Sequence, residues 1–337
     1  MKTIALIFGS TDSEHDISIM SAESVYENFP IDKYHLKPIY IQRDGVWISG
    51  DYTLENFKNK SFPKEQEFFF KFDATKQGLY DLETLEPVHL DGAFLMLHGP
   101  VGEGGMIQGL LELANIPFVG SKQTASAICM DKAFTHQICE KEGIQMAKYQ
   151  LISSVDDVDF DNQQYPVVIK PSREGSSFGI SYADDKASLI EGIETALKFD
   201  SRVLIEDYIL SQELSVAVLQ TKDQTLVSRP VQATRFNVIA DFEEKYISDQ
   251  QETLYDLPYS QSVIDRVMEE SKFIFEVLDC DHLSRIDFFV TEDEDVYFNE
   301  INTIPGFTKS SLYPSMIERE GIPYNRMLEM MIEDIIL

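Results

Sequence analysis

Residues 284–302 read SRIDFFVTEDEDVYFNEIN. Two runs rich in aromatic and β-branched residues flank an acidic quartet, and this pattern predicts a β-hairpin whose turn is residues 292–295. A turn centred there places Asp287 opposite Glu300 and Arg285 opposite Asn302. Because side chains alternate between the two faces of a strand, all four side chains share one face.

The facing carboxylates of Asp287 and Glu300 need a cation between them, since like charges directly opposite one another destabilise a strand pair. Together with the Asn302 amide oxygen, and with no His or Cys, they form the hard oxygen set that Mg²⁺ prefers. In the alternative interpretation the acids are solvated charges on an edge strand, and a register error of one residue would separate them. Neighbours such as Phe288 and Ile301 indicate burial, which favours the metal site.

A second segment, residues 170–179 (KPSREGSSFG), is predicted to be a loop of small residues between two strands. Its backbone N–H groups and hydroxyls are suited to binding phosphate oxygens, and Lys170 stands at the end of the first strand. It is not a P-loop, because GxxxxGK[ST] is absent and no helix follows directly. A flexible hairpin turn is the alternative.

A third segment, residues 97–105 (LHGPVGEGG), leaves a buried strand at residues 93–97 and enters a helix expected over 106–115. Ligands in open α/β sheets bind beyond such strand ends, and helix N-termini attract anions. The segment contains no GxGxxG and does not follow the first strand, which disfavours a Rossmann dehydrogenase. Taken alone, His98 is equally compatible with a structural role.

The chain is strongly acidic: among its 337 residues, 58 Asp and Glu outnumber 28 Lys and Arg, for a formal net charge of −30. Such a charge repels nucleic acid and anionic membranes, so small molecules are the expected partners. Cations are scarce, and Lys132, Lys245 and Arg285 are therefore candidates for binding a phosphorylated substrate. For any one of them taken alone, a surface charge is the favoured interpretation.

The three cysteines form no CxxC pair and leave an odd one over, which is typical of a reducing compartment. The apolar run at residues 4–8 is too short for a signal-peptide core or a membrane span. We therefore expect a cytoplasmic protein.

Alternating strands and helices up to Gly120 predict an α/β domain with a parallel sheet over residues 1–121. The following residues predict α+β subdomains with antiparallel sheets, over 122–212 and 213–337. Residues 49–84 are polar and weakly patterned, and residues 237–251 have the length of a functional loop. The strands expected in the second half are 167–170, 179–182, 203–206 and 214–220, and the helices are 130–142, 187–199, 262–278 and 324–336.

Taken together, these residues resemble the D-alanine–D-alanine ligases of the ATP-grasp superfamily. The matching stretches occur in the family's order over essentially the whole chain. They are residues 8–10 with 13–18, residues 97–99 with 108–109, Met130-Asp131-Lys132, residues 170–179, Glu244-Lys245-Tyr246, residues 285–287 and residues 299–308.

The resemblance implies an N-terminal α/β domain and two ATP-grasp subdomains, with ATP between two antiparallel sheets and residues 175–179 as a lid over its phosphates. Without this context, residues 203–213 would read as an ordinary strand and bend. The implied ATP-binding residues are Lys132 and Lys170 on the phosphates, Glu206 and Glu213 near adenine and ribose, and Lys245. Two Mg²⁺ or Mn²⁺ ions would be held by Asp287, Glu300 and Asn302, in agreement with the hairpin register.

The implied reaction moves the ATP γ-phosphoryl group onto the carboxylate of one D-alanine, because a carboxylate is a poor acyl donor. The amine of a second D-alanine then attacks the acyl phosphate, giving D-alanyl-D-alanine for peptidoglycan and the cell wall. A homodimer is also implied. The implied roles are Arg285 and the Gly306 N–H at the oxyanion, Glu14 and His98 at the first substrate, Ser176 and Tyr246 closing a loop against Glu14, and Ser311 and Leu312 at the second substrate.

Four residues depart from the family pattern: Ser10, Gly104, Ala240 and Lys309. Gly104 and Lys309 leave open a ligase with another second substrate, such as D-serine or D-lactate, whereas Tyr246 and Leu312 favour D-alanine. A nucleotide-binding protein without enzymatic activity is a third alternative, and the intact set of lysines, arginine and metal ligands disfavours it.

Overall fold

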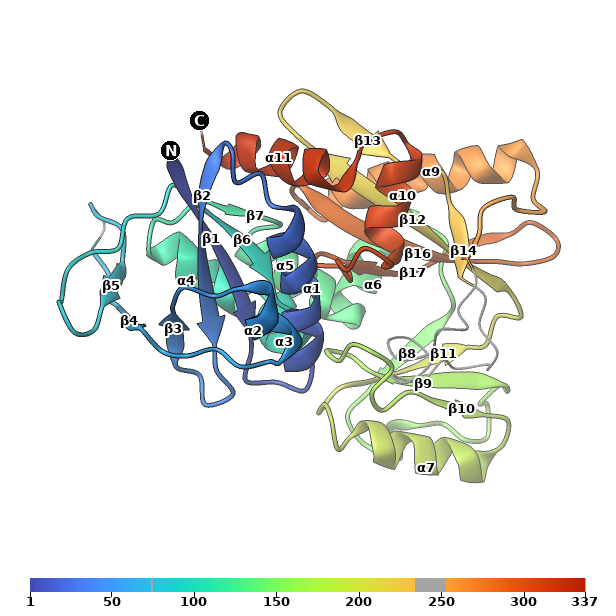
Figure 1. The fold of residues 1–337 in the computed structure, drawn as a ribbon. Coiled ribbons are helices and arrows are strands. Elements are labelled where there is room, and N and C mark those ends of the chain that lie inside the picture. The colour runs from blue at the N-terminus through green and yellow to red at the C-terminus, as the bar shows by residue number, and fades with distance from the viewer. Residues whose placement is uncertain (74, 234–252, 337) are drawn as a thin grey trace.

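The computed structural model describes residues 1–73, 75–233 and 253–336, which form three β-sheets with helices packed on them (Figure 1). A seven-stranded sheet forms first, and a four-stranded and a six-stranded sheet follow along the chain. Within the described residues, no helix is both long enough and apolar enough to cross a membrane.

The N-terminal sheet has the order β5-β4-β3-β2-β1-β6-β7. The expected parallel pairing is confirmed for β1 (Lys2–Gly9), β2 (Tyr34–Ile41), β6 (Gly92–Met96) and β7 (Phe118–Val119). The sheet is nevertheless mixed, because residues 49–84 are more regular than their polarity suggested. β2 is joined to β3 by a connection too short for a parallel crossover, so the extension is antiparallel. The antiparallel strands are β3 (Trp47–Ser49), β4 (Gln66–Phe70) and β5 (Leu79–Asp81), and helix α2 (Leu54–Lys58) lies between β3 and β4 in the chain.

Helix α11 (Tyr324–Ile335) comes from the far end of the chain and packs against the N-terminal sheet. Its side chains, including Met327 and Met331, belong to the same core as those of β1 and β6. Gly92 permits the close approach, since a Cβ there would lie 2.5 Å from Ile335 Cδ1. The two termini therefore lie near each other (Figure 1). The other helices of this part are α1 (His15–Asn28), α3 (Gly99–Glu103) and α4 (Met106–Leu113).

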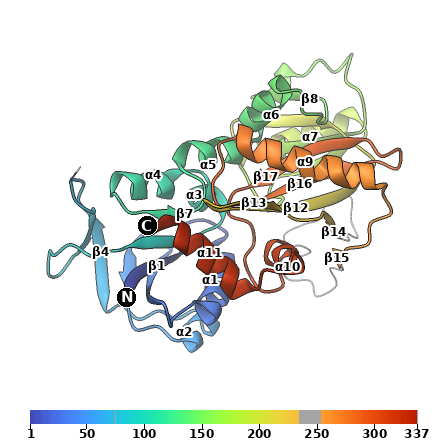
Figure 2. The same cartoon turned by 90° about the horizontal axis from the view of Figure 1, so that it is seen from above.

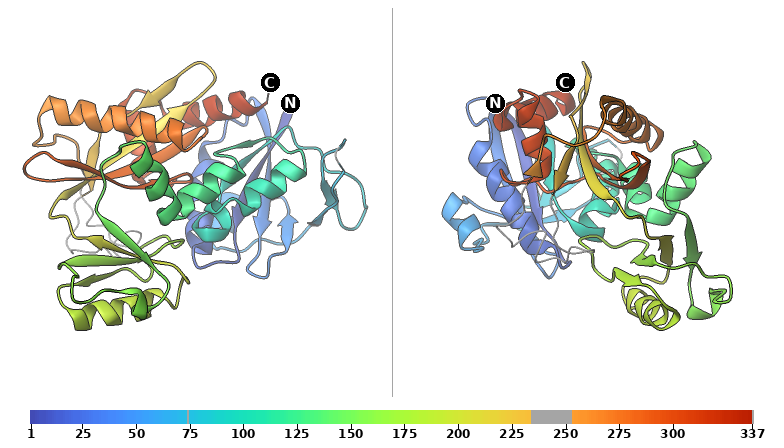
Figure 3. Two further views of the ribbon diagram at one scale, coloured as in Figure 1. Left: turned by 180° about the vertical axis from the view of Figure 1, so that it is seen from behind. Right: turned by 90° about the vertical axis from the view of Figure 1, so that its right-hand side faces the viewer.

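The four-stranded sheet is antiparallel throughout, with the order β10-β9-β11-β8. Helix α7 (Lys186–Ala196) packs on it through Leu189, Ile193 and Ala196. Figure 3 shows this sheet and α7 set apart from the other two sheets. Its strands are β8 (Tyr149–Ile152), β9 (Val167–Pro171), β10 (Ser181–Ala183) and β11 (Val203–Asp207), and a 3₁₀ helix covers Val155–Asp157.

The six-stranded sheet is covered on both faces, by α9 (Gln261–Val277) and by α10 (Leu312–Arg319) (Figure 2). Along its central strand, Leu214, Val216 and Val218 share a core with α9, while Ala217 and Leu219 share the core that includes α10. Ser215 lies on this second face as well, where it lines the cavity described below. The strands are β12 (Gln212–Gln220), β13 (Thr225–Val227), β14 (Val231–Ala233), β15 (Thr253–Leu254), β16 (Leu283–Val290) and β17 (Val296–Asn302).

Residues 123–141 form two helices where the sequence predicted only one, α5 (Gln123–Met130) and α6 (Lys132–Lys141). The break is at Asp131, whose carboxylate accepts hydrogen bonds from the N–H groups of Ala133 (3.1 Å) and Phe134 (3.2 Å). Asp131 is therefore the N-cap of α6, and α5 ends at the residue before it.

Candidate active site

The β16–β17 hairpin has the predicted pairs, Asp287 with Glu300 and Arg285 with Asn302. The predicted turn is wrong, however. Val290 pairs with Val296, so the connection is the five residues 291–295, and the register there differs by one residue from the prediction. A bulge at Asn299 adds one residue to β17 and restores the predicted pairing beyond it.

The bulge also decides which side chains reach the site. Phe298 and Ile301 both belong to the core beneath α9, and two polar residues lie between them instead of one. Strict alternation would direct one of these two toward that core. With the bulge, Asn299 accepts a hydrogen bond from Lys170 (3.1 Å) and Glu300 lines the cavity, so both serve the polar face.

Asp287 is 1% exposed, and both of its carboxylate oxygens are engaged. Oδ1 accepts from Ser215 Oγ (2.6 Å) and Arg285 Nε (3.0 Å). Oδ2 accepts from Arg285 Nη2 (2.8 Å) and Asn302 Nδ2 (3.2 Å). The guanidinium thus compensates the buried carboxylate, and Arg285 is held in place at the cavity.

Lys170 and Glu206 form a buried ion pair with 2.7 Å between Nζ and Oε2. Burial alone would lower the pKa of Lys170, but the charge of Glu206 and the hydrogen bond to it raise that pKa above its usual value. Glu206 Oε1 and His136 Nδ1, 3.9 Å apart, have no hydrogen-bond partner among the described residues. Unpartnered buried polar atoms of this kind are typical of a place that a ligand fills.

The predicted phosphate-binding loop, residues 170–179, has a strained backbone at two serines. Ser176 and Ser177 adopt left-handed φ angles of 48° and 63°, an uncommon conformation for residues other than glycine. Lys132 Nζ donates to the Glu174 carbonyl (2.6 Å), and a Cβ on Gly175 would lie 3.2 Å from Glu14 Oε1. The loop therefore lies between the lysine at the start of α6 and the N-terminal domain.

His98 is buried where the N-terminal sheet meets the C-terminal hairpin. Its Nε2 lies 2.9 Å from Ser21 Oγ and its Nδ1 lies 3.2 Å from the Ile304 carbonyl oxygen. Burial lowers its pKa to about 4, the hydrogen bond to Ile304 opposes this, and the nearby Arg285 contributes to the lowering. His98 is consequently a neutral imidazole at physiological pH.

This pKa predicts a stability that depends on pH. The folded-state pKa of about 4 lies below the usual 6.5, so the unfolded chain binds a proton first and folding is penalised as the pH falls from 6.5 to 4. The full penalty is about 3 kcal/mol, at about 1.4 kcal/mol per pKa unit. His98→Gln should flatten the dependence of the free energy of unfolding on pH in this window, measured with urea. His35→Gln, at an exposed position, is the control and should leave the slope unchanged.

Glu103 is a site residue that the sequence analysis did not single out. It ends α3, lines the cavity, and accepts a hydrogen bond at Oε1 from the Gly99 N–H (3.1 Å). Burial and the charge of Glu14 raise its pKa to about 8. In the sequence, the only indication of its role was that Glu103 lies in segment 97–105, which follows a predicted strand.

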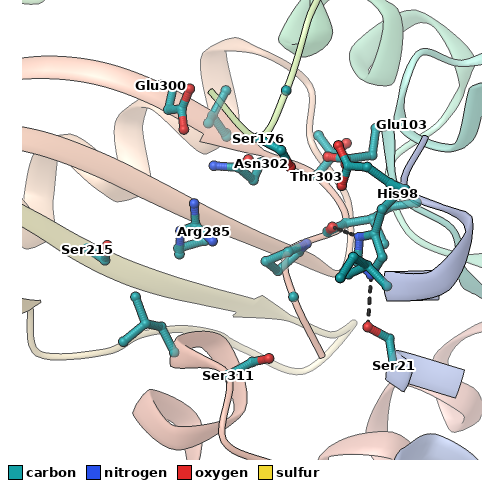
Figure 4. A pocket seen from close by; sticks show the side chains of 18 of the residues that line it. Ser21, His98, Glu103, Ser176, Ser215, Arg285, Glu300, Asn302, Thr303 and Ser311 are labelled. Atoms are coloured by element: carbon teal, nitrogen blue, oxygen red, sulfur yellow. Dashed lines mark hydrogen bonds between the residues drawn. The ribbon is translucent and has the colours of Figure 1, made fainter. Parts of the chain in front are cut away.

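These groups surround a cavity of about 400 Å³ at the junction of the N-terminal, central and C-terminal parts. In the view of Figure 4, Arg285, Glu300 and Asn302 from the hairpin lie on one side, and His98 and Glu103 lie on the other. Ten of the predicted site residues line it: Glu14, His98, Lys132, Ser176, Arg285, Glu300, Asn302, Gly306, Ser311 and Leu312.

The remaining predicted residues lie near the cavity or outside the described part. Asp287 contacts the lining residues Ser215, Arg285 and Asn302. Lys170 and Glu206 lie outside the lining, and Lys170 contacts Asn299, the neighbour of Glu300. Glu213 lies on β12 opposite Phe289. Tyr246, Lys245 and Ala240 fall within residues 234–252, outside the described residues.

Two of the departures from the family pattern have local explanations. Lys309 Nζ pairs with Glu27 Oε2 of α1 (2.9 Å) on an exposed surface. Gly104 closes the turn of α3 by donating its N–H to Pro100 O (3.0 Å), and a Cβ at this position would lie 2.3 Å from that oxygen. The glycine therefore permits a tighter turn than a residue with a side chain would.

Two family models match the chain, the D-ala D-ala ligase N-terminus at residues 3–121 and the D-ala D-ala ligase C-terminus at residues 137–333. The chain belongs to the D-alanine–D-alanine ligase family. Among curated relatives, the D-alanine–D-alanine ligase of Clostridium novyi is 39% identical, over 98% of this chain and 97% of that protein. The one from Caldicellulosiruptor bescii is 36% identical, over 98% and 93%.

Solved structures of the family are also similar to this chain. The VanG D-Ala:D-Ser ligase from Enterococcus faecalis has a TM-score of 0.89 and 32% identity, covering 98% of both chains. The D-alanine–D-alanine ligase from Coxiella burnetii has a TM-score of 0.83 and 28% identity, covering 100% of this chain and 95% of that one. The protein is thus a ligase with the ATP-grasp fold.

Proposed function

We propose that this protein joins two D-alanine molecules to D-alanyl-D-alanine at the expense of ATP, through a D-alanyl phosphate, for peptidoglycan synthesis. The observation that carries the proposal is the cavity in which Glu14 and Glu103, Arg285, Lys132 and the hairpin carboxylate Glu300 converge. Acidic groups for an ammonium and cations for phosphate and carboxylate lie in one enclosed space, as ligation of an amino acid requires.

The hairpin residues carry the donor types that bind divalent metal ions of the kind that accompany ATP, and a metal ion at Asp287 would replace the hydrogen bonds that its carboxylate accepts from Arg285 and Asn302. Asp287, Glu300 and the Asn302 amide offer hard oxygen atoms on one face of β16 and β17, and no His or Cys joins them. We propose these three residues as ligands of two Mg²⁺ or Mn²⁺ ions, which when bound neutralise charge on the phosphate oxygens.

The cations of the chain serve the phosphates of ATP in this proposal. Lys170 is kept charged by Glu206, and Lys132 Nζ lies between the Glu174 carbonyl and Glu300 Oε2, 3.9 Å away. Both lysines stabilise the negative charge that spreads over the transferring phosphoryl oxygens. Glu206 Oε1, which has no hydrogen-bond partner among the described residues, is available to accept a hydrogen bond from the adenine amino group. Glu213 is proposed to bind the ribose, and Lys245 is proposed as a further ATP-binding residue.

The first D-alanine is proposed to bind with its ammonium at Glu14 and Glu103 and its carboxylate toward Arg285. Burial and the charge of Glu14 raise the pKa of Glu103, so Glu103 holds a proton at pH 7, and an arriving ammonium favours its ionised form. Neutral His98 adds no charge that would repel this ammonium. Ser176 and Tyr246 are proposed to hold the site closed against water.

The second D-alanine is proposed to bind at the N-terminus of α10. Ser311 precedes the helix, its Oγ accepts from Thr308 N (3.0 Å), and Leu312 lines the cavity with its apolar side chain. The positive end of the helix and Ser311 suit a carboxylate. The Gly306 N–H, next to Ser311, and Arg285 are proposed to stabilise the oxyanion formed when the second amine attacks.

The test is incubation of the purified protein with ATP, Mg²⁺ and D-alanine. We expect phosphate release that requires D-alanine, and D-alanyl-D-alanine by mass spectrometry. Phosphate release without the dipeptide, or no release at all, contradicts the proposal. Because a D-Ala:D-Ser ligase is among the similar structures, D-serine is added in competition. A predominant D-alanyl-D-serine product would favour that second activity.

Glu103→Gln should weaken recognition of the first substrate. Losing one charge-assisted hydrogen bond, worth about 1.5–3 kcal/mol, corresponds to a rise of about 10- to 100-fold in the KM of the first D-alanine. D-Alanine binding should also release a proton from the native enzyme at pH 7 and not from this variant, since Glu103 ionises beside the ammonium. The proton is measured with an indicator dye. Glu112→Gln, exposed on α4, should change neither quantity.

We also propose where the protein is located, how it assembles and where its domains divide. All three cysteines are free, which supports a cytoplasmic location. A homodimer is proposed from the family and is tested by sedimentation. The family models end at residue 121 and begin again at 137, which supports the first proposed boundary between 1–121 and 122–212, with 213–337 as the last unit.

A further inference from the structure

Two of the three cysteines lie side by side next to the active site. Cys129 is in the last turn of α5, and Cys280 lies between α9 and β16. Their sulfur atoms are 3.6 Å apart, and both side chains are buried. The reaction proposed above uses neither thiol.

The residues just before α5 are hydrogen-bonded to the segment that carries Cys280. The N–H of Asp281 donates to Ser121 Oγ (3.1 Å), and the N–H of Gly120 donates to His282 Nδ1 (3.3 Å). A disulfide requires about 2.05 Å between its sulfur atoms. Forming the bond would therefore bring the two sulfur atoms about 1.5 Å closer, through side-chain rotation and a shift of α5.

The two thiols are suited to different steps: Cys280 reacts first, and Cys129, whose pKa is raised by the hydrogen bond with Cys280 and by burial, reacts second as a protonated thiol. Cys129 lines the cavity of about 400 Å³, which gives a small oxidant a route to the pair. The hydrogen bond from Cys129 lowers the pKa of Cys280, burial opposes this, and hydrogen bonds with Ser121 and Ser284 contribute to the lowering. Burial raises the pKa of the third thiol, Cys139, to about 12, so it stays protonated. Since the thiolate is the nucleophile, Cys280 reacts in preference to Cys139.

We propose that Cys129 and Cys280 form an oxidation site, which a two-electron oxidant such as hydrogen peroxide converts into a disulfide that slows the ligase. The Cys280 thiolate attacks one peroxide oxygen and becomes a sulfenic acid, while the other oxygen leaves as hydroxide and is protonated to water. The Cys129 sulfur then attacks the sulfenyl sulfur. The S–OH bond breaks, and hydroxide leaves with the Cys129 proton as a second water.

The effect on turnover follows from the position of Cys129 in the chain. Cys129 lies two residues before Asp131. The carboxylate of Asp131 caps α6 and accepts a hydrogen bond from Ser172 Oγ (2.7 Å). The N–H of Lys132 donates to the Ser172 carbonyl (2.9 Å). Pulling Cys129 toward Cys280 therefore displaces Lys132 and the start of the phosphate loop. This consequence rests on the proposed function, whereas the disulfide itself does not.

The experiment treats the full-length enzyme with hydrogen peroxide, blocks remaining thiols with N-ethylmaleimide, and maps peptides by mass spectrometry. We expect one linked peptide pair containing Cys129 and Cys280, two hydrogen atoms lighter than the reduced pair, with Cys139 alkylated. Turnover at low ATP should fall by about tenfold, since displacements near 1 Å at a distance can cost this much or more. Dithiothreitol should restore it.

Two variants make the test specific. Cys280→Ser should keep its turnover after peroxide and yield no linked pair, and Cys139→Ser should behave as the native chain does. A link through Cys139, or irreversible oxidation of separate thiols, overturns the proposed site. If Cys280→Ser fails to fold, peptide mapping of the native enzyme decides the site. A complete disulfide with unchanged turnover at low ATP overturns the coupling, provided that D-alanine-dependent activity was measured before oxidation.

Discussion

Glu300→Gln is expected to lower kcat by at least about 100-fold while the fold is retained, because several kcal/mol of charge stabilisation are lost with one metal-binding carboxylate. Glu300 lies opposite Asp287 across the hairpin and within 3.9 Å of Lys132 Nζ, so it stands between another proposed metal ligand and a lysine proposed to bind phosphate. Gln keeps the size of the side chain and removes its charge. The backbone pairs and the bulge of β17 do not depend on that charge.

The measurement is phosphate release at several Mg²⁺ concentrations, together with circular dichroism and the unfolding midpoint. Glu292→Gln is the matched control: it lies in the connection of the same hairpin and is exposed, so its turnover should equal that of the native chain. A Glu300→Gln enzyme with full activity would refute the assignment of Glu300 as a metal ligand.

Lys170→Met is expected to impair both stability and activity. The substitution leaves the Glu206 carboxylate buried beside His136 without its cation, and breaking such a pair costs about 3–5 kcal/mol. It also removes one of the proposed phosphate-binding cations, so turnover should fall by about 100-fold or more. The free energy of unfolding in urea and the KM for ATP are the two measurements.

A second substitution separates the two effects. In Lys170→Met/Glu206→Gln the buried carboxylate is gone, and much of the lost stability should return. Turnover should stay low, since no cation has been restored at the phosphates. Recovery of turnover with stability in the double variant would mean that Lys170 acts only as the counter-ion of Glu206.

The residues of the hairpin were sufficient, by themselves, to predict its strands and its central pairs. Period-two alternation and the acidic quartet were sufficient to predict the hairpin, and the pairing of Asp287 with Glu300 is confirmed. The reason was partly wrong, because the longer connection and the bulge at Asn299 offset each other. The alternation of polar and apolar residues does not reveal this bulge, because Asn299 and Glu300 are both polar. Either of them could be the residue that points away from the core.

Other parts of the site were beyond the sequence. Glu103 is an unremarkable acid in a Gly-rich segment until burial next to Glu14 raises its pKa to about 8. The closeness of Cys129 and Cys280 and the docking of α11 on the N-terminal sheet join residues far apart in the chain. Hydrophobic periodicity predicts that a face is buried and does not say which partner covers it.

The sequence by itself determined many of the strands and helices, the hairpin that carries Arg285, Asp287, Glu300 and Asn302, and the family to which the motifs belong. Those features depend on residues near one another in the chain or on fixed motifs. Only the tertiary structure decided the environment of the charges: which lysine is kept charged by Glu206, which glutamate holds its proton, and why His98 is neutral. Desolvation and Coulomb interactions depend on distances in space, and folding sets those distances.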